Sequence, residues 1–411
     1  RLLPSQLTGR LLEFTQPQIR DLIEQIPRRV GYPWLRPLSQ CYTPPGGPLI
    51  RTLVGHKEQI NAVCVSPDGE KVISAAGKGY SGIYGGASSD NTIKIWDIED
   101  GSCLLTLPGS SQGITALCID PHGKFLVSAS NDFTIRIWDI EEGKEIKVLQ
   151  NHKGVVDSVI LTPDGKKLIS TSIDMTVKVW ETETFTLLFS IDNFYQNGHV
   201  CISHAGNRLA VRLRGDIVKI YNLEDGNPIA AIPCLGNPMS FSPDDTKIIV
   251  VSNALGNFRN SIFVWDIEPP KETFRFEGHS GAVYGIQFTP DHQKMISAGA
   301  DKTLRVWDWE KHKELFTLSG HKSSVTSLVV TTDGKGIISA SEDKSIKCWD
   351  IESGTEIASF DDHQGRVLSM KVTPDGKKLV SGSTDMTVKI WNLSNRNNPT
   401  ASQKNMGMDS I

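Results

Sequence analysis

The sequence predicts an all-β protein in which eight similar four-stranded sheets close into a ring. Three observations predict this fold: a recurring aromatic pair, short segments that alternate with strand periodicity, and turn residues between those segments. An aromatic residue followed by Asp, Glu or Asn ends each unit, at intervals of 41 to 44 residues. The eight pairs are Trp96-Asp97, Trp138-Asp139, Trp180-Glu181, Tyr221-Asn222, Trp265-Asp266, Trp307-Asp308, Trp349-Asp350 and Trp391-Asn392.

The order inside a unit is regular, as its sixth copy shows. A Gly-His pair at 278–279 is followed by alternating residues 283–288, a Pro-Asp turn at 290–291, and strand-like segments at 294–298 and 303–307. In turns such as Pro67-Asp68-Gly69, Pro presets φ near about −65° and Gly supplies a positive φ. Such a meander cannot bury both faces alone, so the copies must stack, and a closed ring leaves few exposed edges.

The ends of the repeat region indicate how the ring closes. Residues 49–54 precede the first Gly-His pair, whereas the residues that follow Trp391 are too polar for another core strand. We therefore expect residues 49–54 to supply the outer strand of the last sheet. The predicted organisation is an extension at 1–48, an eight-bladed β-propeller at 49–393 and a polar tail at 394–411.

The repeat resembles that of the WD40 family, which runs from a Gly-His pair to a Trp-Asp pair over about 40 residues. The resemblance covers residues 49–393, and in four of its five full signatures His precedes Asp by 22 residues and Asp precedes Trp by 6. The full signatures are His56/Asp90/Trp96, His152/Asp174/Trp180, His279/Asp301/Trp307, His321/Asp343/Trp349 and His363/Asp385/Trp391. The resemblance implies that these residues form a buried hydrogen-bond network in each blade with a serine such as Ser297 or Ser339.

Three units depart from the signature because they lack its histidine. Unit two has Ser110 at that place, and unit four has Tyr221 in place of tryptophan. Arg212 and Arg214 are expected where a sister unit has Ser170 and Ser172, two residues apart on one strand face. They either bind an anionic group of a partner or pair with nearby acids, for which the candidates are Asp192 and Glu224.

Two enlarged loops, at 77–87 in unit one and 253–260 in unit five, fall between the second and third strands of their units. The resemblance places such loops on the upper face, where units four apart in a ring of eight stand opposite each other. They are either partner-binding loops or tolerated insertions. The candidate partner-binding residues of the upper face are Lys78, Tyr80, Tyr84, Arg212, Arg214, Phe258, Arg259, Tyr284 and Arg366.

No motif in the sequence predicts catalysis or a cofactor. A G-x-G-x-x-G match at 77–82 leads into a strand rather than a helix, so it does not predict dinucleotide binding, and no G-x-x-x-x-G-K-[ST] loop occurs. The histidines outside the signature lack ligand spacing; His199 and Cys201 are expected on one strand face and His204 on the other. We predict no catalytic residue, no metal and no cofactor.

Composition narrows the class of partner. With 43 basic and 47 acidic residues the net charge is −4, which offers no general attraction to nucleic acid or to an anionic membrane. No apolar run approaches the length of a spanning helix, and the first residues lack the apolar core of a signal peptide. Seven dispersed cysteines without a C-x-x-C pair fit reduced thiols. We expect a cytoplasmic protein that binds a protein or peptide.

The extension differs in kind from the repeats. Thr15 and Gln18 form a capping box, and an apolar stripe of Ile19, Leu22, Ile23 and Ile26 predicts a short amphipathic helix before Pro27. The lead-in that follows consists of residues 33–38 and 43–53 and ends at the Gly55-His56 pair. It resembles the segment joining the nucleotide-binding half of bacterial apoptosome-like signalling NTPases, the STAND class, to their C-terminal WD40 sensor. The resemblance implies a propeller that senses a ligand and restrains an upstream switch. A free-standing WD40 adaptor is the alternative, and an enzyme with a site at the central channel is a third hypothesis.

Overall fold

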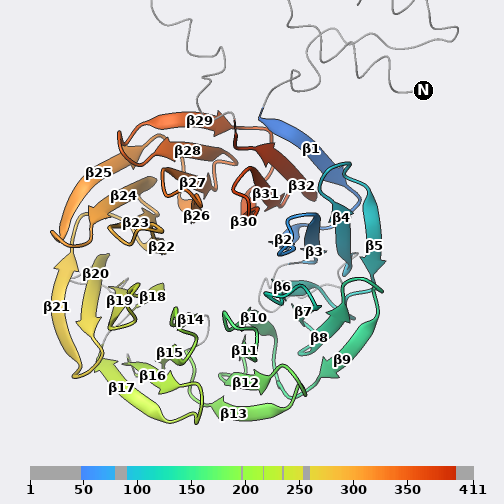
Figure 1. Cartoon of the computed structure of the whole chain (residues 1–411), viewed down its shortest axis with the longest axis horizontal. Helices are drawn as coiled ribbons and strands as arrows, with labels where there is room; N and C mark the ends of the chain where they lie inside the picture. The colour runs from blue at the N-terminus through green and yellow to red at the C-terminus, as the bar shows by residue number, and fades with distance from the viewer. Residues whose placement is uncertain are drawn as a thin grey trace, which may run out of the picture.

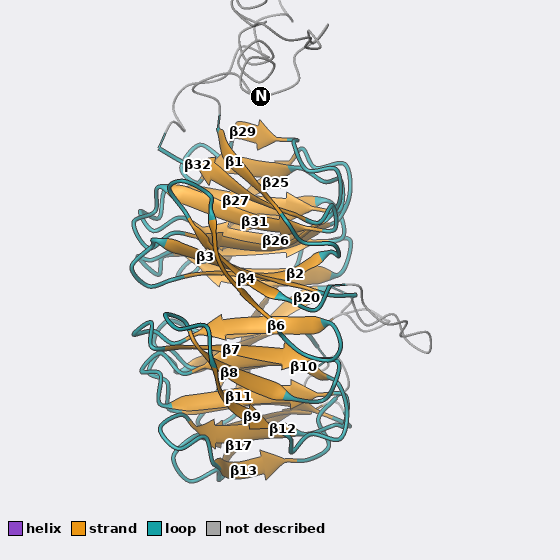
Figure 2. Cartoon of the chain, turned by 90° about the vertical axis from the view of Figure 1, so that its right-hand side faces the viewer, coloured by secondary structure: helices purple, strands orange, loops and turns teal. Residues whose placement is uncertain are grey.

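A computed structural model shows eight antiparallel sheets arranged around a central opening (Figure 1). It describes residues 48–78, 90–195, 198–215, 217–233, 236–252 and 260–394. Seen from the side, the loops gather at two opposite faces of the ring (Figure 2). We call upper the face formed by turns that join the second to the third strand of a blade and one blade to the next. The opposite face is the lower face.

The strands follow the chain in blade order. Blades 1 to 4 contain β2 (Ile60–Val65), β3 (Lys71–Ala76), β4 (Ile93–Asp97), β5 (Cys103–Leu107); β6 (Ile114–Ile119), β7 (Phe125–Ser130), β8 (Ile135–Asp139), β9 (Glu145–Leu149); β10 (Val156–Leu161), β11 (Lys167–Ser172), β12 (Val177–Glu181), β13 (Leu187–Ile191); and β14 (Val200–Ile202), β15 (Arg208–Leu213), β16 (Ile217–Asn222), β17 (Pro228–Pro233). Blades 5 to 8 contain β18 (Met239–Phe241), β19 (Lys247–Ser252), β20 (Ser261–Asp266), β21 (Lys271–Phe276); β22 (Val283–Phe288), β23 (Lys294–Gly299), β24 (Thr303–Asp308), β25 (Lys313–Ser319); β26 (Val325–Val330), β27 (Gly336–Ser341), β28 (Ile346–Asp350), β29 (Glu356–Phe360); and β30 (Val367–Val372), β31 (Lys378–Ser383), β32 (Thr387–Asn392) with β1 (Leu49–Val54).

The first described strand completes the last blade. The sheet order β1-β32-β31-β30 places β1 outermost, and Leu53 lies opposite Val388 in the antiparallel register. Figure 1 shows β1 and β32, from the two ends of the repeat region, side by side. The ring is therefore closed by hydrogen bonds between segments more than 330 residues apart in the chain.

The core consists of apolar layers between adjacent blades. In one layer Ile73 and Ile95 of blade 1 pack with Leu117, Leu126 and Trp138 of blade 2. The signature tryptophan of one blade thus packs against the preceding blade, and Trp138 is almost completely buried. Because each sheet alternates side chains between its two faces, one meander contributes to two layers. The predicted all-β, eight-bladed propeller is confirmed.

Blades 4 and 5 differ from the others at their inner edge. Their inner strands, β14 and β18, have three residues each, whereas the inner strands of the other blades have six. The described residues contain no helix, and among them none could cross a membrane as a long apolar helix. The amphipathic helix predicted before Pro27 lies outside the described residues.

Candidate functional site

A buried chain of hydrogen bonds joins tryptophan to aspartate in five blades. In blade 6, Trp307 Nε1 donates to Ser297 Oγ over 2.8 Å, that oxygen lies 2.8 Å from His279 Nε2, and His279 Nδ1 lies 2.8 Å from Asp301 Oδ2. A carboxylate only accepts, so Nδ1 carries the ring proton and Nε2 accepts from the serine hydroxyl. The same chain joins Trp96, Ser74, His56 and Asp90; Trp180, Ser170, His152 and Asp174; Trp349, Ser339, His321 and Asp343; and Trp391, Ser381, His363 and Asp385.

The order Ser–His–Asp is that of a hydrolase triad, but the surroundings differ. Ser297 is fully buried, and its oxygen already accepts the hydrogen bond from Trp307. The His279 side chain is also almost completely buried. A substrate cannot reach these atoms. These hydrogen bonds therefore connect the upper turns of the blade to its second and third strands.

The aspartate of each network is held in its charged form. Although burial opposes ionisation, hydrogen bonds from the Lys153 amide, Thr176 and His152 lower the pKa of Asp174 to about 2. Burial lowers the pKa of His152 more strongly than Asp174 raises it. The network of blade 3 therefore pairs an ionised carboxylate with a neutral imidazole, which avoids placing a second charge in the core.

The network is incomplete in the three units that lack the histidine. In blade 2, Ser110 Oγ lies 2.7 Å from Ser130 Oγ, and Trp138 Nε1 still donates to Ser128. In blades 4 and 5, strand register places Val211 and Val250 where the other blades have the network serine. Consequently the indole nitrogen of Trp265, in blade 5, is buried without a hydrogen-bond partner.

The predicted placement of Arg212 and Arg214 is wrong by one residue. Pairing of Arg208 with Asn222, and of Lys167 with Glu181, aligns Val211 with Ser170 and Leu213 with Ser172. Arg212 therefore lies on the opposite sheet face, because successive side chains alternate. Arg214 follows the end of β15 and lies in a turn. Glu224, a proposed partner of these arginines, instead pairs with Lys167 at 3.1 Å.

The other upper-face candidates are not all within the described residues. Tyr80, Tyr84, Phe258 and Arg259 lie outside them, as does most of both enlarged loops. The carbonyl of Lys78 accepts from Asn131 Nδ2 at 3.2 Å, which joins blade 1 to blade 2. Tyr284, near the upper end of inner strand β22, is 48% exposed. Arg366 lies in the turn before β30 and pairs with Glu342 at 3.3 Å.

Sequence reasoning missed a set of upper-face side chains that directly follow the aspartate of the turn before the third strand. In five blades this residue has a positive φ without being glycine. The set comprises Phe133, Met175, Lys302, Lys344 and Met386, with φ between 66° and 76°. Phe133 and Met386 are exposed to solvent. Their position one residue after the repeated aspartate was the signal that could have identified them.

The lower face carries a different repeated feature, an ion pair between neighbouring blades. The first residue of a second strand, a lysine or arginine, reaches a glutamate in a lower turn of the next blade. The pairs are Lys71–Glu141, Lys167–Glu224, Arg208–Glu268, Lys294–Glu352 and Lys378–Glu99. Between blades 2 and 3 the contact is aromatic, since Phe125 and Phe185 meet edge to face at 5.5 Å.

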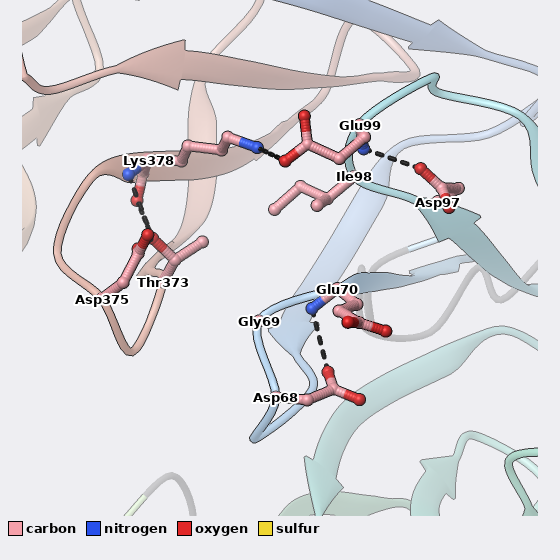
Figure 3. A pocket seen from close by; sticks show the side chains of 9 residues that line it. All are labelled: Asp68, Gly69, Glu70, Asp97, Ile98, Glu99, Thr373, Asp375 and Lys378. Carbon is pink, nitrogen blue, oxygen red and sulfur yellow. Dashed lines mark hydrogen bonds and ion pairs between the residues drawn. The ribbon is translucent and has the colours of Figure 1, made fainter.

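A pocket of about 450 Å³ lies on this face at the seam between blades 8 and 1 (Figure 3). Lys378 from blade 8 pairs with Glu99 from blade 1 at one side of it, and Asp68 accepts from the backbone of Glu70 at the other. The remaining lining residues are Gly69, Asp97, Ile98, Thr373 and Asp375. Within the described part of the chain, no three His, Cys, Asp or Glu side chains are grouped as metal ligands would be.

The histidines around β14 are separated by the structure. His199 precedes the strand, and its amide donates to Asn237 Oδ1 at 3.1 Å. Cys201 is half-buried within the strand, whereas His204 lies in a lower turn, where Nδ1 is 3.1 Å from Asp245 Oδ1. The predicted alternation of these residues along one strand is therefore wrong, because β14 ends at Ile202.

Comparison with known proteins places the repeats in one family. The model "WD domain, G-beta repeat" matches residues 47–97, 101–139, 143–181, 270–308, 312–350 and 354–392, more than half of the chain. The stretch without a match, between residues 181 and 270, corresponds to blades 4 and 5, in which the buried network is lost.

Two relatives each match about a fifth of the chain. Nuclear distribution protein PAC1 of Coccidioides posadasii is 40% identical over 80 residues, which are 19% of this chain and 16% of that protein. An uncharacterized WD repeat-containing protein, sll1491, of Synechocystis sp. is 30% identical over 82 residues, 20% of each chain. The crystal structure of the computationally designed Ika8 protein superposes with a TM-score of 0.71 and 26% identity, covering 84% of this chain and all of that one.

WD40 propellers are in general non-catalytic scaffolds for protein partners. The repeated sequence unit, the buried tryptophan-to-aspartate network and the family match agree on one classification. The chain belongs to the WD40 repeat family and folds as an eight-bladed WD40 β-propeller.

Proposed function

We propose that this propeller is a non-catalytic interaction module whose upper face binds a protein or peptide partner. The observation that carries the proposal is the conformation of the residues that follow the repeated aspartate. An L-residue other than Gly, Asn or Asp in the left-handed region costs about 1–2 kcal/mol. Blade 5 has Asn260 with φ 64° immediately before its third strand, but blades 2, 3 and 8 have Phe133, Met175 and Met386.

These apolar residues incur two costs at once. Their backbone is strained, and the side chains of Phe133 and Met386 are exposed to water rather than buried. Stability of the isolated propeller would favour Asn or Gly at both positions. A partner that covers the upper face supplies a reason to retain large apolar side chains there, since such side chains contribute much of the energy of protein interfaces.

The distribution of exposed apolar residues supports the same face. The upper face and the upper ends of the inner strands carry Phe133, Tyr195, Tyr284, Leu368 and Met386, each between 40% and 48% exposed. The outer strands carry Leu104, Ile146, Leu187 and Leu188 in blades 1 to 3, and Val54 in blade 8. The described lower turns carry none of the exposed large apolar side chains, which argues against that face as the principal interface.

A paired substitution tests the proposal. The double substitution Phe133→Asn with Met386→Asn introduces residues that tolerate a positive φ and removes the two exposed apolar side chains. We therefore expect an unchanged or higher unfolding temperature together with weaker partner binding. The matched control is Leu104→Ser with Ile146→Ser, which removes exposed apolar side chains from the outer strands and should leave binding intact. Equal binding by the wild type and the upper-face variant would refute the proposal.

In its finer form, the proposal is that the propeller is the ligand-sensing and autoinhibitory region of a larger bacterial STAND-type signalling NTPase. Its support is the lead-in before Gly55-His56 that resembles the linker of that class. A ligand that binds only the released propeller would shift the parent protein towards its active state. A partner would then include the upstream nucleotide-binding domain of the same polypeptide, in a cytoplasmic protein that binds neither nucleic acid nor membrane.

The alternative is a free-standing adaptor that brings partners together. The size of the native polypeptide separates the two, because the chain described here has a mass of 45.2 kDa. Blotting of source cells should detect a much larger band if the propeller is a sensor of an upstream switch. A band near the mass of this chain would refute the sensor form and leave the adaptor form standing.

A further inference from the structure

The inner edge of blade 4 is interrupted at the level of Arg212. Phe194 forms an isolated bridge with Leu213, and pairing resumes with Val200 opposite Val211. Arg212 is the one residue of β15 between these two pairings. We call Tyr195, Gly198 and His199 together the Tyr195 turn; residues 196 and 197 lie outside the described ranges.

Close contacts fix the two ends of the Tyr195 turn. The Gly198 amide donates to the Tyr195 carbonyl at 2.6 Å, and the Tyr195 amide donates to the Arg212 carbonyl at 3.1 Å. A Cβ at Gly198 would lie 2.5 Å from the Tyr195 carbonyl oxygen and 2.8 Å from the Phe194 ring, so only glycine fits. His199 is held from blade 5, since its amide donates to Asn237 Oδ1.

The turn places an aromatic ring against an arginine. The guanidinium carbon of Arg212 lies 4.0 Å from the ring centroid of Tyr195, which is cation–π distance. Val211 and Leu213 belong to the core layer shared with blade 3, whereas Ala210 belongs to the layer shared with blade 5. Arg212 therefore lies on the side of the sheet that faces blade 5, near the upper end of β15.

Arg212 lacks an anionic partner among the described residues. Its Nε is buried without a hydrogen-bond partner, and no ion pair joins its guanidinium to a described carboxylate. The carboxylates that form ion pairs in blades 4 and 5 do so with other cations. Those pairs are Glu224–Lys167, Asp245–His204, Glu268–Arg208, Asp266–Lys247 and Glu272–Arg275.

A half-buried guanidinium without an anion is unfavourable, and stacking on a ring offsets only part of the cost. The planar fork of arginine matches a carboxylate, which it binds with paired hydrogen bonds. Tyr195 remains 40% exposed, so the stack is accessible from solvent. Arg214, exposed in the next turn, adds positive charge beside it.

We infer that Arg212, stacked on Tyr195, is a subsite that binds an acidic side chain, Asp or Glu, of the partner protein. The inference rests on the proposed partner-binding function, which it deepens by naming the chemistry of one contact. Phosphate shares the charge and hydrogen-bonding geometry of a carboxylate, so the two sources must be separated by experiment.

The first experiment measures binding of small anions at Arg212 in the absence of a partner protein. The Nε–H resonance of Arg212 in the intact chain is followed by NMR while N-acetyl-glutamate methylamide or, separately, inorganic phosphate is added. We expect a saturable shift of this resonance with the glutamate probe, and a parallel shift of the Tyr195 ring resonances, which every variant retains. The Tyr195 shift should be absent in Arg212→Gln and weaker in Arg212→Lys, which keeps the charge but loses the planar fork. The matched control is Arg275, which lies over the Phe263 ring at 5.3 Å but already pairs with Glu272 at 3.2 Å; its resonance should not respond.

The second experiment measures partner binding. Arg212→Gln should weaken binding about tenfold or more, whereas Arg275→Gln should not change it. Absence of any response of Arg212 to the glutamate probe would overturn the subsite, and saturation by phosphate alone would overturn the choice of a carboxylate. If the glutamate probe binds but no partner binds the upper face, the subsite stands and the proposed function fails. Equal unfolding temperatures of the variants exclude loss of the fold as the cause.

Discussion

Trp307 donates its indole hydrogen to Ser297 over 2.8 Å, whereas Trp265, one blade earlier, has no acceptor for the same group. Both tryptophans occupy the same register position of their blades, opposite Met295 and Ile248. The difference is that Val250 stands in blade 5 where Ser297 stands in blade 6. The same fold thus tolerates a polar network and an apolar substitute at equivalent positions.

This difference predicts unequal costs for the same substitution. Trp307→Phe removes the hydrogen bond that Ser297 accepts and leaves the buried hydroxyl with only its bond to His279, for an expected loss of about 2–4 kcal/mol including the lost packing. Trp265→Phe loses packing but no hydrogen bond, so we expect a loss smaller by about 1 kcal/mol. Urea unfolding of both variants measures the difference, and equal losses would contradict the role assigned to the serine.

Removal of a network aspartate should lower the free energy of unfolding more than removal of a surface aspartate. Asp343→Ala leaves His321 and the Lys322 amide without their acceptor, and we expect a loss of about 2–4 kcal/mol. Asp375→Ala is the matched control, since Asp375 accepts from Thr373 and the Lys377 amide in an exposed lower turn. That control should lose less than about 1 kcal/mol. Similar midpoints for both variants in thermal unfolding would argue against a structural network.

The network also predicts a pH dependence of stability. Burial lowers the pKa of His152 and His321 below the usual 6.5, so the unfolded chain binds protons more readily than the folded chain. The contribution of these two neutral histidines to the free energy of unfolding is therefore complete above pH 6.5 and is lost as the pH falls below that value.

A second loss should follow at lower pH. Hydrogen bonds that outweigh the opposing effect of burial bring the pKa of Asp174 and Asp343 from 3.8 to about 2, so their contribution is lost as the pH falls from 3.8 towards about 2. Urea midpoints measured across the range should decline in these two windows. A stability maximum below the first window would contradict the neutral state assigned to the histidines.

Closure of the ring should depend on packing rather than on its ion pair. Leu53 of β1 is buried against Val380 and Val388 of blade 8, so Leu53→Ala should cost about 2–4 kcal/mol. Glu99, which pairs with Lys378 across the same seam, is 80% exposed, so Glu99→Gln should cost less than about 1 kcal/mol. Chemical denaturation of the two variants compares them, and a larger loss from Glu99→Gln would reverse the assignment.

The sequence predicted the parts of the fold that repeat. Intervals of about 42 residues between tryptophans follow from identical packing of one blade on the next, so the number of blades could be predicted from spacing alone. Blade 4 was aligned one residue out of register because its histidine, serine and tryptophan anchors are all replaced. This one-residue error placed Arg212 on the wrong face of the sheet, so its contact with Tyr195 could not be predicted.

Contacts between blades could not be predicted in the same way. Lys378 and Glu99 are separated by 279 residues, and nothing in either local sequence indicates the other. The residue types of Phe133 and Met386 also give no sign of their positive φ, since neither favours that conformation; only their position after the repeated aspartate could have indicated it. These features depend on tertiary geometry, and they include the residues on which the proposed partner-binding face depends.

The most direct test of that face is photo-crosslinking from two positions of the propeller in source cells. A benzophenone amino acid replaces Phe133 on the upper face or Ile146 on an outer strand, both of which are exposed. We expect a discrete crosslinked protein from position 133, weakened by Arg212→Gln, and none from position 146. A partner captured from position 146 and not from 133 would contradict binding at the upper face.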